Sequence, residues 1–236
     1  MKLLHRLIMS LFLLVLTAEA QTNRFNSTQG FSFEYPQKWV VATKEQQIAA
    51  SSELKSAFKQ LGDINFDRIA AVVFNPADDG FIESVNVVIT QGSIPVNEDS
   101  RQKHIQAVTE QLRNAGVKVT DIKSELTRFG EHQALSLQQT LNDPSGNGLI
   151  RQWQIAMPGR NQTYIITATA RVENFPTYEA SFKKIFESFE VDGGSLGFWH
   201  GLPGWVQNAL IGAGIGALIG MLGSLFKKMS QSLNED

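Results

Sequence analysis

The sequence predicts an α+β domain in which helices cover an antiparallel sheet, with a separate apolar segment at each end of the chain. Residues 25–191 alternate between strand-type and helix-type patterns in the order ββα, ββα, ββββ, α. Successive strand patterns are separated by short turns, which is typical of antiparallel pairing. Both ends of the chain are far more apolar than the middle. We therefore expect the folded domain to lie between two apolar segments that are not part of it.

The expected elements follow from the spacing of apolar residues. Strand patterns occupy 31–36, 39–42, 68–74, 83–91, 117–128, 131–141, 149–157 and 162–172. Helical spacing covers 44–61 and 97–115, and a third helix begins near Asn174 with Pro176 in its first turn. The turn-rich segment 142–148 joins two strands as a hairpin. These patterns predict one sheet of about six to eight strands with the helices packed on it.

Composition excludes one class of function and leaves the fold independent of cross-links. The chain has 236 residues and no cysteine, which is long enough to bury a core without disulfides or zinc thiolates. Lys and Arg number 21 and Asp and Glu number 23, so the formal net charge is −2. A sequence-independent nucleic-acid binder normally carries a basic excess. We therefore expect no nucleic-acid partner.

Residues 1–20 have the pattern of an export signal. A basic start with Lys2 and Arg6 precedes the ten residues 7–16, which are apolar except for Ser10. Residues 17–20, Thr-Ala-Glu-Ala, then present the small-x-small pattern that signal peptidase accepts. The alternative is an uncleaved anchor, but a helix needs about 20 residues to cross a bilayer. We predict cleavage after Ala20 and an exported domain over 21–191.

The C-terminal end predicts a membrane span. Residues 192–203 form a glycine-rich tether, and no ionisable side chain occurs from 201 to 226. A helix over 204–226 is long enough to cross a bilayer, since its rise is about 1.5 Å per residue. Trp199 and Trp205 suit one membrane interface, and Lys227 and Lys228 suit the cytoplasmic side. We therefore expect a single-pass protein with an exported domain and a cytoplasmic tail at 227–236.

Small residues follow one stripe of this predicted span. At 100° per residue they fall within about 80° of the helix circumference. Such a stripe lets another helix approach closely. One alternative is that glycine is simply common in membrane helices, as Gly214 on the opposite face illustrates. Another is a buried soluble helix, which glycines at about 1 kcal/mol each would destabilise. The predicted helix-packing residues are Ala209, Gly212, Gly216, Gly220 and Gly223.

The four histidines do not predict a metal site. His5 lies in the signal and His200 in the tether, His104 lies in the second predicted helix, and His132 begins a strand beside Glu131. No two of them have metal-ligand spacing, and no cysteine is present. Glu131 and His132 could form half of a metal site or an acid–base pair, although a solvated strand end is the preferred interpretation. We predict no metal and no cofactor.

Other chemical motifs are also missing from the sequence. Residues 78–80, Asp-Asp-Gly, could bind calcium weakly, but they lack the alternating oxygen ligands of an EF-hand loop and favour a plain turn. The sequence contains no nucleophile elbow, P-loop or dinucleotide fingerprint. A site assembled from distant residues stays open in principle. We nevertheless predict that the protein is not an enzyme.

Two stretches resemble the PsbP/DcrB-like superfamily. The first is residues 30–36, GFSFEYP, followed by Trp39. The second is residues 164–170, YIITATA, followed by a Tyr-Glu pair and the aromatic stretch 182–189. The resemblance implies an α-β-α sandwich and a non-enzymatic role. Members serve as extrinsic photosystem subunits, periplasmic envelope proteins, Ran-binding proteins or chaperones for effector transmembrane helices. Most members lack a C-terminal glycine-rich span.

These observations together predict a membrane-tethered, exported binding or assembly module. It would contact a membrane-protein partner, or associate with itself through the glycine stripe. The alternative is a membrane-active oligomer that forms a pore, with the exported domain as its regulator. That alternative is weaker, because a span without a polar stripe offers little to line an aqueous channel. A bacterial inner membrane, a thylakoid and a eukaryotic secretory membrane all fit this topology, and a small-molecule ligand is left open.

Overall fold

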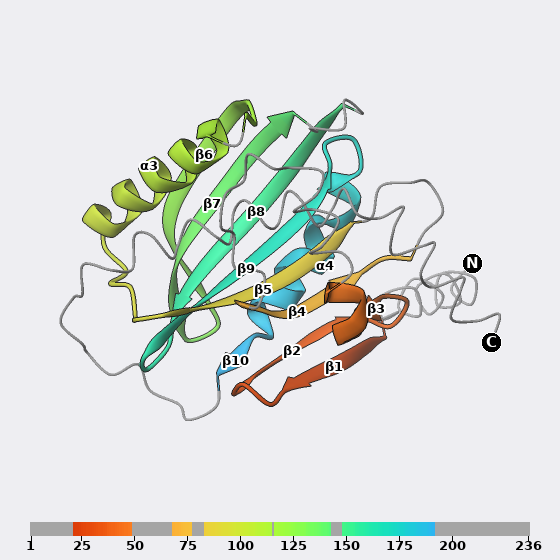
Figure 1. The fold of residues 1–236 in the computed structure, drawn as a ribbon. Coiled ribbons are helices and arrows are strands. Elements are labelled where there is room, and N and C mark those ends of the chain that lie inside the picture. Colours follow the sequence, from red (N-terminus) through yellow and green to blue (C-terminus); the bar gives the residue numbers. More distant parts are fainter. Residues whose placement is uncertain (1–20, 49–67, 77–82, 115, 143–147, 192–236) are drawn as a thin grey trace, which may run out of the picture.

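A computed structural model describes residues 21–48, 68–76, 83–114, 116–142 and 148–191 (Figure 1). The predicted signal 1–20, tether 192–203, span 204–226 and tail 227–236 lie outside these residues, and so does most of the helix predicted at 44–61. That helix begins where expected, with residues 44–48 helical. Thr43 and Gln46 form a capping box, in which the backbone N–H of Gln46 donates to Thr43 Oγ1 and that of Thr43 donates to Gln46 Oε1.

A seven-stranded antiparallel sheet forms the middle of the domain. Its order is β3-β4-β5-β9-β8-β7-β6, so β5 lies between β4 and β9, and β6, the strand that follows β5 in the chain, is at the far edge. The hairpin expected across 142–148 is confirmed by the antiparallel pairing of β7 with β8. The α+β class with an antiparallel sheet is therefore confirmed. The strands are Val40–Val41 (β3), Ile69–Phe74 (β4), Ser84–Gln91 (β5), Val119–Phe129 (β6), His132–Asn142 (β7), Leu149–Pro158 (β8) and Gln162–Arg171 (β9).

A second, three-stranded sheet corrects the prediction of a single sheet. Its order is β1-β2-β10, with bounds Thr22–Ser27, Phe31–Pro36 and Glu190–Val191. The strand at 31–36 was predicted, but its two partners were not, because β1 has one apolar residue, Phe25, and β10 has only two residues. Because β2 pairs with both, this sheet joins the two ends of the domain. An ion pair between Arg24 and Glu190 adds to that junction.

Two helices cover opposite faces of the seven-stranded sheet, as Figure 1 shows. Helix α3, Glu98–Asn114, packs Val108 and Leu112 on the face that carries Leu137 of β7. Helix α4, Phe175–Glu187, packs on the face that carries Trp153 of β8. The faces differ because Leu137 lies opposite Gln154, the neighbour of Trp153. The domain therefore has a helix–sheet–helix arrangement, with both helices close to their predicted bounds.

Aromatic rings fill the core between α4 and the sheets. Phe186 is fully buried and meets Phe129 and Trp153 edge to face, with ring centroids 5.5 and 5.0 Å apart. Phe31 and Phe33 of β2 each stack on Phe189, which lies two residues after the end of α4. Edge-to-face and offset pairs add about 0.5–1.5 kcal/mol each beyond the apolar area that they bury. Helix α4 therefore connects the small sheet to the large one.

We expect Phe186→Ala to lower the free energy of unfolding by about 3–5 kcal/mol, because it removes a buried ring and leaves a cavity. Urea unfolding of the full chain, followed by circular dichroism, measures this loss. Lys184→Ala on the exposed face of the same helix is the control and should stay within about 0.5 kcal/mol. Equal effects of the two substitutions would contradict the assignment of Phe186 to the core.

Candidate functional site

The residues predicted from sequence to act at the membrane all lie outside the described ranges. These are the helix-packing residues Ala209, Gly212, Gly216, Gly220 and Gly223 and the interface residues Trp199, Trp205, Lys227 and Lys228. They stay predictions. Within the described parts of the chain, no helix combines the length and apolar character needed to cross a membrane.

The Glu131–His132 pair lies at the turn between β6 and β7. Glu131 is exposed and His132 is half-buried. Across residues 21–48, 68–76, 83–114, 116–142 and 148–191, no three or more His, Asp or Glu side chains are grouped as a metal site requires. The Asp-Asp-Gly segment 78–80 lies outside those residues.

A row of buried polar side chains crosses the α3 face of the sheet, where an apolar layer would be the usual choice. Its members lie opposite one another on neighbouring strands, as the register shows. Gln139 Nε2 donates to Gln152 Oε1 at 2.8 Å, and Gln152 Nε2 donates to Thr169 Oγ1 at 3.3 Å. We call this set the polar row; it consists of Ser84, Asn86, Gln139, Gln152, Gln154, Thr167 and Thr169.

His104 of α3 is hydrogen-bonded to the polar row. Its Nε2 lies 2.8 Å from Gln154 Oε1, while Gln154 Nε2 donates to Thr167 Oγ1. Gln154 Oε1 is an acceptor, so His104 Nε2 carries the proton of this hydrogen bond. Nδ1 is buried and has no hydrogen-bond partner among the described residues. Burial lowers the pKa of His104, and the hydrogen bond to Gln154 only partly opposes that effect.

The polar row is an unfavourable choice for stability alone. Within the part of the chain that the structure describes, Ser84 Oγ, Asn86 Oδ1 and Gln139 Oε1 are buried without hydrogen-bond partners, and each such group costs about 1–3 kcal/mol. Each hydrogen bond within the polar row contributes only about 1 kcal/mol to the free energy of unfolding. A row of this kind restricts how α3 can lie on the sheet, since the helix must present His104 to Gln154.

We expect the free energy of unfolding to fall as pH drops below about 6.5, the ordinary pKa of histidine. The pKa of His104 is lowered in the folded state. As the pH falls, the unfolded state therefore takes up this proton at a higher pH than the folded state does, and protonation stabilises the unfolded state relative to the folded one. The slope that one proton produces is up to about 1.4 kcal/mol per pH unit. Urea unfolding of wild type and His104→Gln between pH 5 and 8 measures it, and the variant should lose this slope. If His132→Gln removes the slope instead, His104 is not its source.

Among the described strands, β6 forms one edge of the large sheet, which we call the open edge. Of the described strands, only β7 pairs with it. It is eleven residues long, whereas β3 at the opposite edge has two. Ile122 and Leu126 of β6 are 36% and 45% exposed, so apolar side chains face solvent beside this edge. A long edge strand with exposed apolar side chains is a ready template for another strand.

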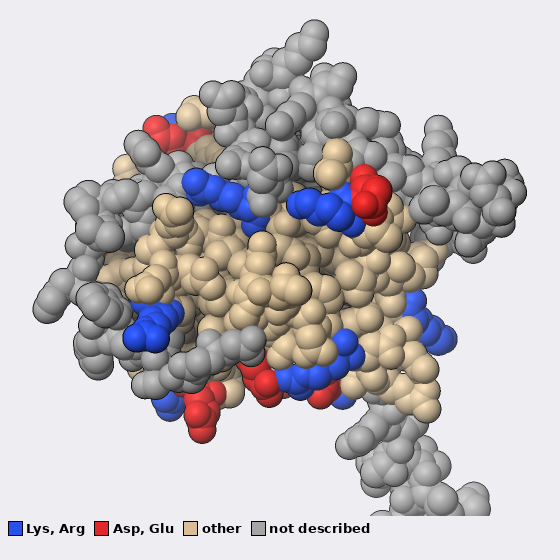
Figure 2. All heavy atoms as spheres, turned by 60° about the horizontal axis from the view of Figure 1, so that its bottom comes forward, with Lys and Arg blue, Asp and Glu red and all other residues tan. Residues whose placement is uncertain are grey.

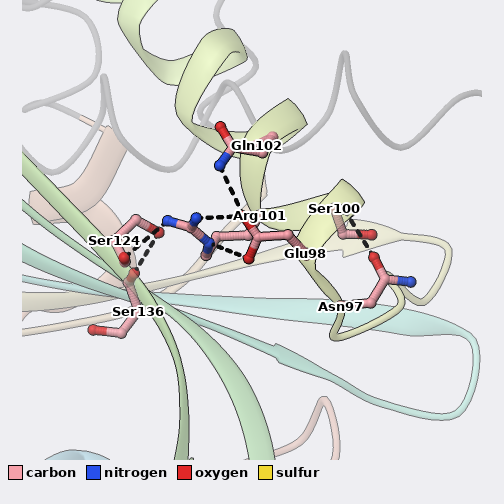
Figure 3. A network of polar contacts seen from close by, with 7 residues as sticks. All are labelled: Asn97, Glu98, Ser100, Arg101, Gln102, Ser124 and Ser136. Carbon is pink, nitrogen blue, oxygen red and sulfur yellow. Dashed lines mark hydrogen bonds and ion pairs between the residues drawn. The ribbon is translucent and has the colours of Figure 1, made fainter.

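The start of α3 lies against the same edge through Arg101 (Figure 3). Arg101 Nη1 donates to the carbonyl oxygen of Ser124 at 3.0 Å, and its other nitrogens donate to the Glu98 carboxylate. Gln102 Nε2 also donates to Glu98. These hydrogen bonds, with that from Arg101 first, lower the pKa of Glu98 to about 2, so the carboxylate stays charged at neutral pH. The charged pair holds Arg101 in place over the middle of β6.

Charge on the face turned forward in Figure 2 is dispersed. Most of the visible described surface is uncharged, and the Lys and Arg side chains lie toward its margins. Lys183 and Lys184 are exposed on α4, and Lys183 pairs with Glu187 at 3.6 Å. The described part of this face carries no single basic stripe of the kind that follows a nucleic-acid backbone.

Two features of the site were missed from sequence. His104 lies four residues before Val108 and eight before Leu112, so helical spacing already places all three on one face. The sequence therefore contained a signal that His104 faces the sheet. The open edge at β6 had no local signal, because it depends on β9 entering the sheet between β5 and β8.

Comparison with known families identifies the class of the domain. A family model described as PsbP-like protein matches residues 16–191, and the chain therefore belongs to the PsbP-like protein family. This confirms the PsbP-like part of the resemblance seen in the sequence. A separate comparison with curated proteins found no match.

Several solved structures are similar to the chain at low identity. CyanoP, the cyanobacterial PsbP of Synechocystis sp. PCC 6803, has 12% identity and a TM-score of 0.49, and the match covers 75% of this chain and 95% of that one. LpqN of Mycobacterium tuberculosis has 13% identity and a TM-score of 0.43, with 73% and 91% covered. The Ran-binding protein Mog1p of Saccharomyces cerevisiae has 11% identity and a TM-score of 0.43, with 73% and 96% covered.

Proposed function

We propose that the chain is an exported, membrane-tethered binding or assembly module without enzymatic activity. Its PsbP-like domain would lie outside the cytoplasm, and the segment 204–226 would cross the membrane with the tail 227–236 on the cytoplasmic side. The partner is a membrane protein, or a second copy packed against the glycine stripe. The domain contributes a protein-binding edge at β6.

The observation that carries the proposal is the PsbP-like domain over residues 16–191. The resemblance to that family implies binding and assembly roles and not catalysis. The open β6 edge supports a protein-binding role, since an exposed edge strand recognises another chain through its backbone. The apolar ends of the sequence support export and tethering.

Affinity purification tests this function directly. We expect the tagged full chain, extracted from membranes, to retain a membrane-protein partner that also retrieves this chain in the reciprocal purification. A version truncated after Gly194 is the comparison. Loss of the partner on truncation assigns recognition to the segment beyond Gly194, and retention assigns it to the domain. An untagged copy of the chain is co-expressed, and recovery of neither another membrane protein nor this copy above a tag-only control, with either version, would contradict the proposal.

The glycine stripe has its own test. We expect Gly216→Leu to reduce crosslinking between helices in membranes at least about ten-fold, because a leucine on the stripe prevents close helix approach. Gly214→Leu is the matched control, since Gly214 lies on the opposite face of the predicted helix. Equal crosslinking in the two variants would show that the stripe is not the contact. Liposome leakage caused by the wild-type chain would favour the pore alternative.

A further inference from the structure

The backbone groups that β6 presents to solvent can be identified from its side-chain hydrogen bonds. Ser124 Oγ donates to the carbonyl oxygen of Ser136 at 2.8 Å, so this carbonyl of β7 points at β6. Ser136 lies opposite Glu125. Antiparallel residues alternate between hydrogen-bonded and non-hydrogen-bonded pairs. Glu125 therefore bonds to β7, and the N–H and C=O of Ser124 point toward the open edge. The approach of Arg101 to the Ser124 carbonyl agrees with this (Figure 3).

The side chains of β6 are arranged symmetrically about Ser124, the middle residue of Val119–Phe129. Two residues away on either side are the exposed Ile122 and Leu126. One residue away on either side are Lys123 and Glu125, which are both exposed and opposite in charge. When the pattern Ile-Lys-Ser-Glu-Leu is reversed about Ser124, each apolar residue therefore coincides with an apolar residue, and each charged residue coincides with one of opposite charge.

We propose that β6 pairs antiparallel with β6 of a second copy of this chain, with the two-fold axis at Ser124. This rests on the proposed function only in taking the β6 edge as a protein-binding site. Position 124+n of one copy then faces position 124−n of the other. Lys123 lies opposite Glu125 of the second copy, and Ile122 lies opposite Leu126, each contact occurring twice. The two seven-stranded sheets become one continuous sheet.

The backbone geometry matches this side-chain pattern. Since Ser124 points its N–H and C=O outward, the Ser124 pair on the axis is a hydrogen-bonded pair, and the Lys123–Glu125 pairs are non-hydrogen-bonded pairs. Side chains come closest in non-hydrogen-bonded pairs, where opposite charges gain most. A carbonyl oxygen has two lone pairs, so the Ser124 carbonyl can keep Arg101 and accept from the second copy together.

Other registers are less favourable. An axis at Lys123 or at Glu125 would place identical charges directly opposite each other, which is destabilising. An axis at Ile122 or at Leu126 would shorten the overlap, because only Ser124 is equidistant from both ends of the strand. A two-fold interface must be complementary to itself. The β6 sequence meets that requirement, which favours a second copy over an unrelated strand.

A single cysteine tests the contact, because the chain has none of its own. Ser124→Cys places two cysteines on the axis, where Cα atoms are about 5.5 Å apart, within disulfide range. Mild oxidation of the full chain should convert most of this variant to a covalent dimer. Thr28→Cys, exposed in the turn after β1, is the control and should crosslink at least about ten-fold less. Equal crosslinking of the two would overturn the proposal.

Charge reversal tests the register. Lys123→Glu, and separately Glu125→Lys, place like charges opposite each other twice, and each should raise the dimer dissociation constant about ten-fold. The double variant Lys123→Glu/Glu125→Lys restores opposite charges and should return to within about three-fold of wild type. Lys184→Glu on α4 is the control and should leave the constant unchanged. Sedimentation equilibrium of the full chain carrying Gly216→Leu measures the constant without a contribution from the glycine stripe.

The outcomes separate this inference from the proposed function. A monomeric chain, or a double variant as weak as the single ones, would overturn β6 self-pairing. If a different membrane protein is then recovered in the purification and is lost on Lys123→Glu, the β6 edge binds that partner and the proposed function stands. If no partner is recovered but Ser124→Cys crosslinks, self-pairing stands and the partner part of the function falls.

Discussion

The structure depends on the register between β8 and β9, the strands that carry both layers of the core. Trp153, Ile155 and Met157 of β8 face the aromatic core under α4, while Gln152 and Gln154 face α3. Side chains alternate along a strand, so a slip by one residue would bring both glutamines into the aromatic core. The cost of burying them there, without partners, fixes the register. The backbone hydrogen bonds between neighbouring strands then fix the register of the other strands in the sheet.

The same register explains why the two faces of the sheet behave differently. On the α4 side, Phe182 and Phe186 bury apolar surface and supply stability. On the α3 side, apolar contact is limited to a smaller cluster around Val108 and Leu112. The polar row beside that cluster contributes orientation more than free energy, because several of its atoms have no hydrogen-bond partner in the described ranges. Helix α3 is therefore held on its face of the sheet less strongly than α4 is held on the opposite face.

Much of the fold was predictable because apolar spacing is a local property. The strands at 68–74, 149–157 and 162–172 and the two helices were found within a few residues. Strand β1 was missed since Phe25 alone carries its apolar signal, and β10 is too short to have one. The polar row could not be found locally either. Gln152 and Gln154 alternate with apolar residues, a pattern that normally indicates a strand with one face in water.

Helix α3 connects the polar row to the open edge. His104 and Arg101 are three residues apart, so they lie about one turn from each other on the same helix. His104 bonds to Gln154 in the middle of the sheet, and Arg101 bonds to Ser124 at its edge. The helix spans from one to the other, and its position is set by both contacts. A change that displaces α3 from Gln154 also removes Arg101 from β6. The edge is therefore not an isolated surface, because the polar interior of the sheet holds the helix that lies against it.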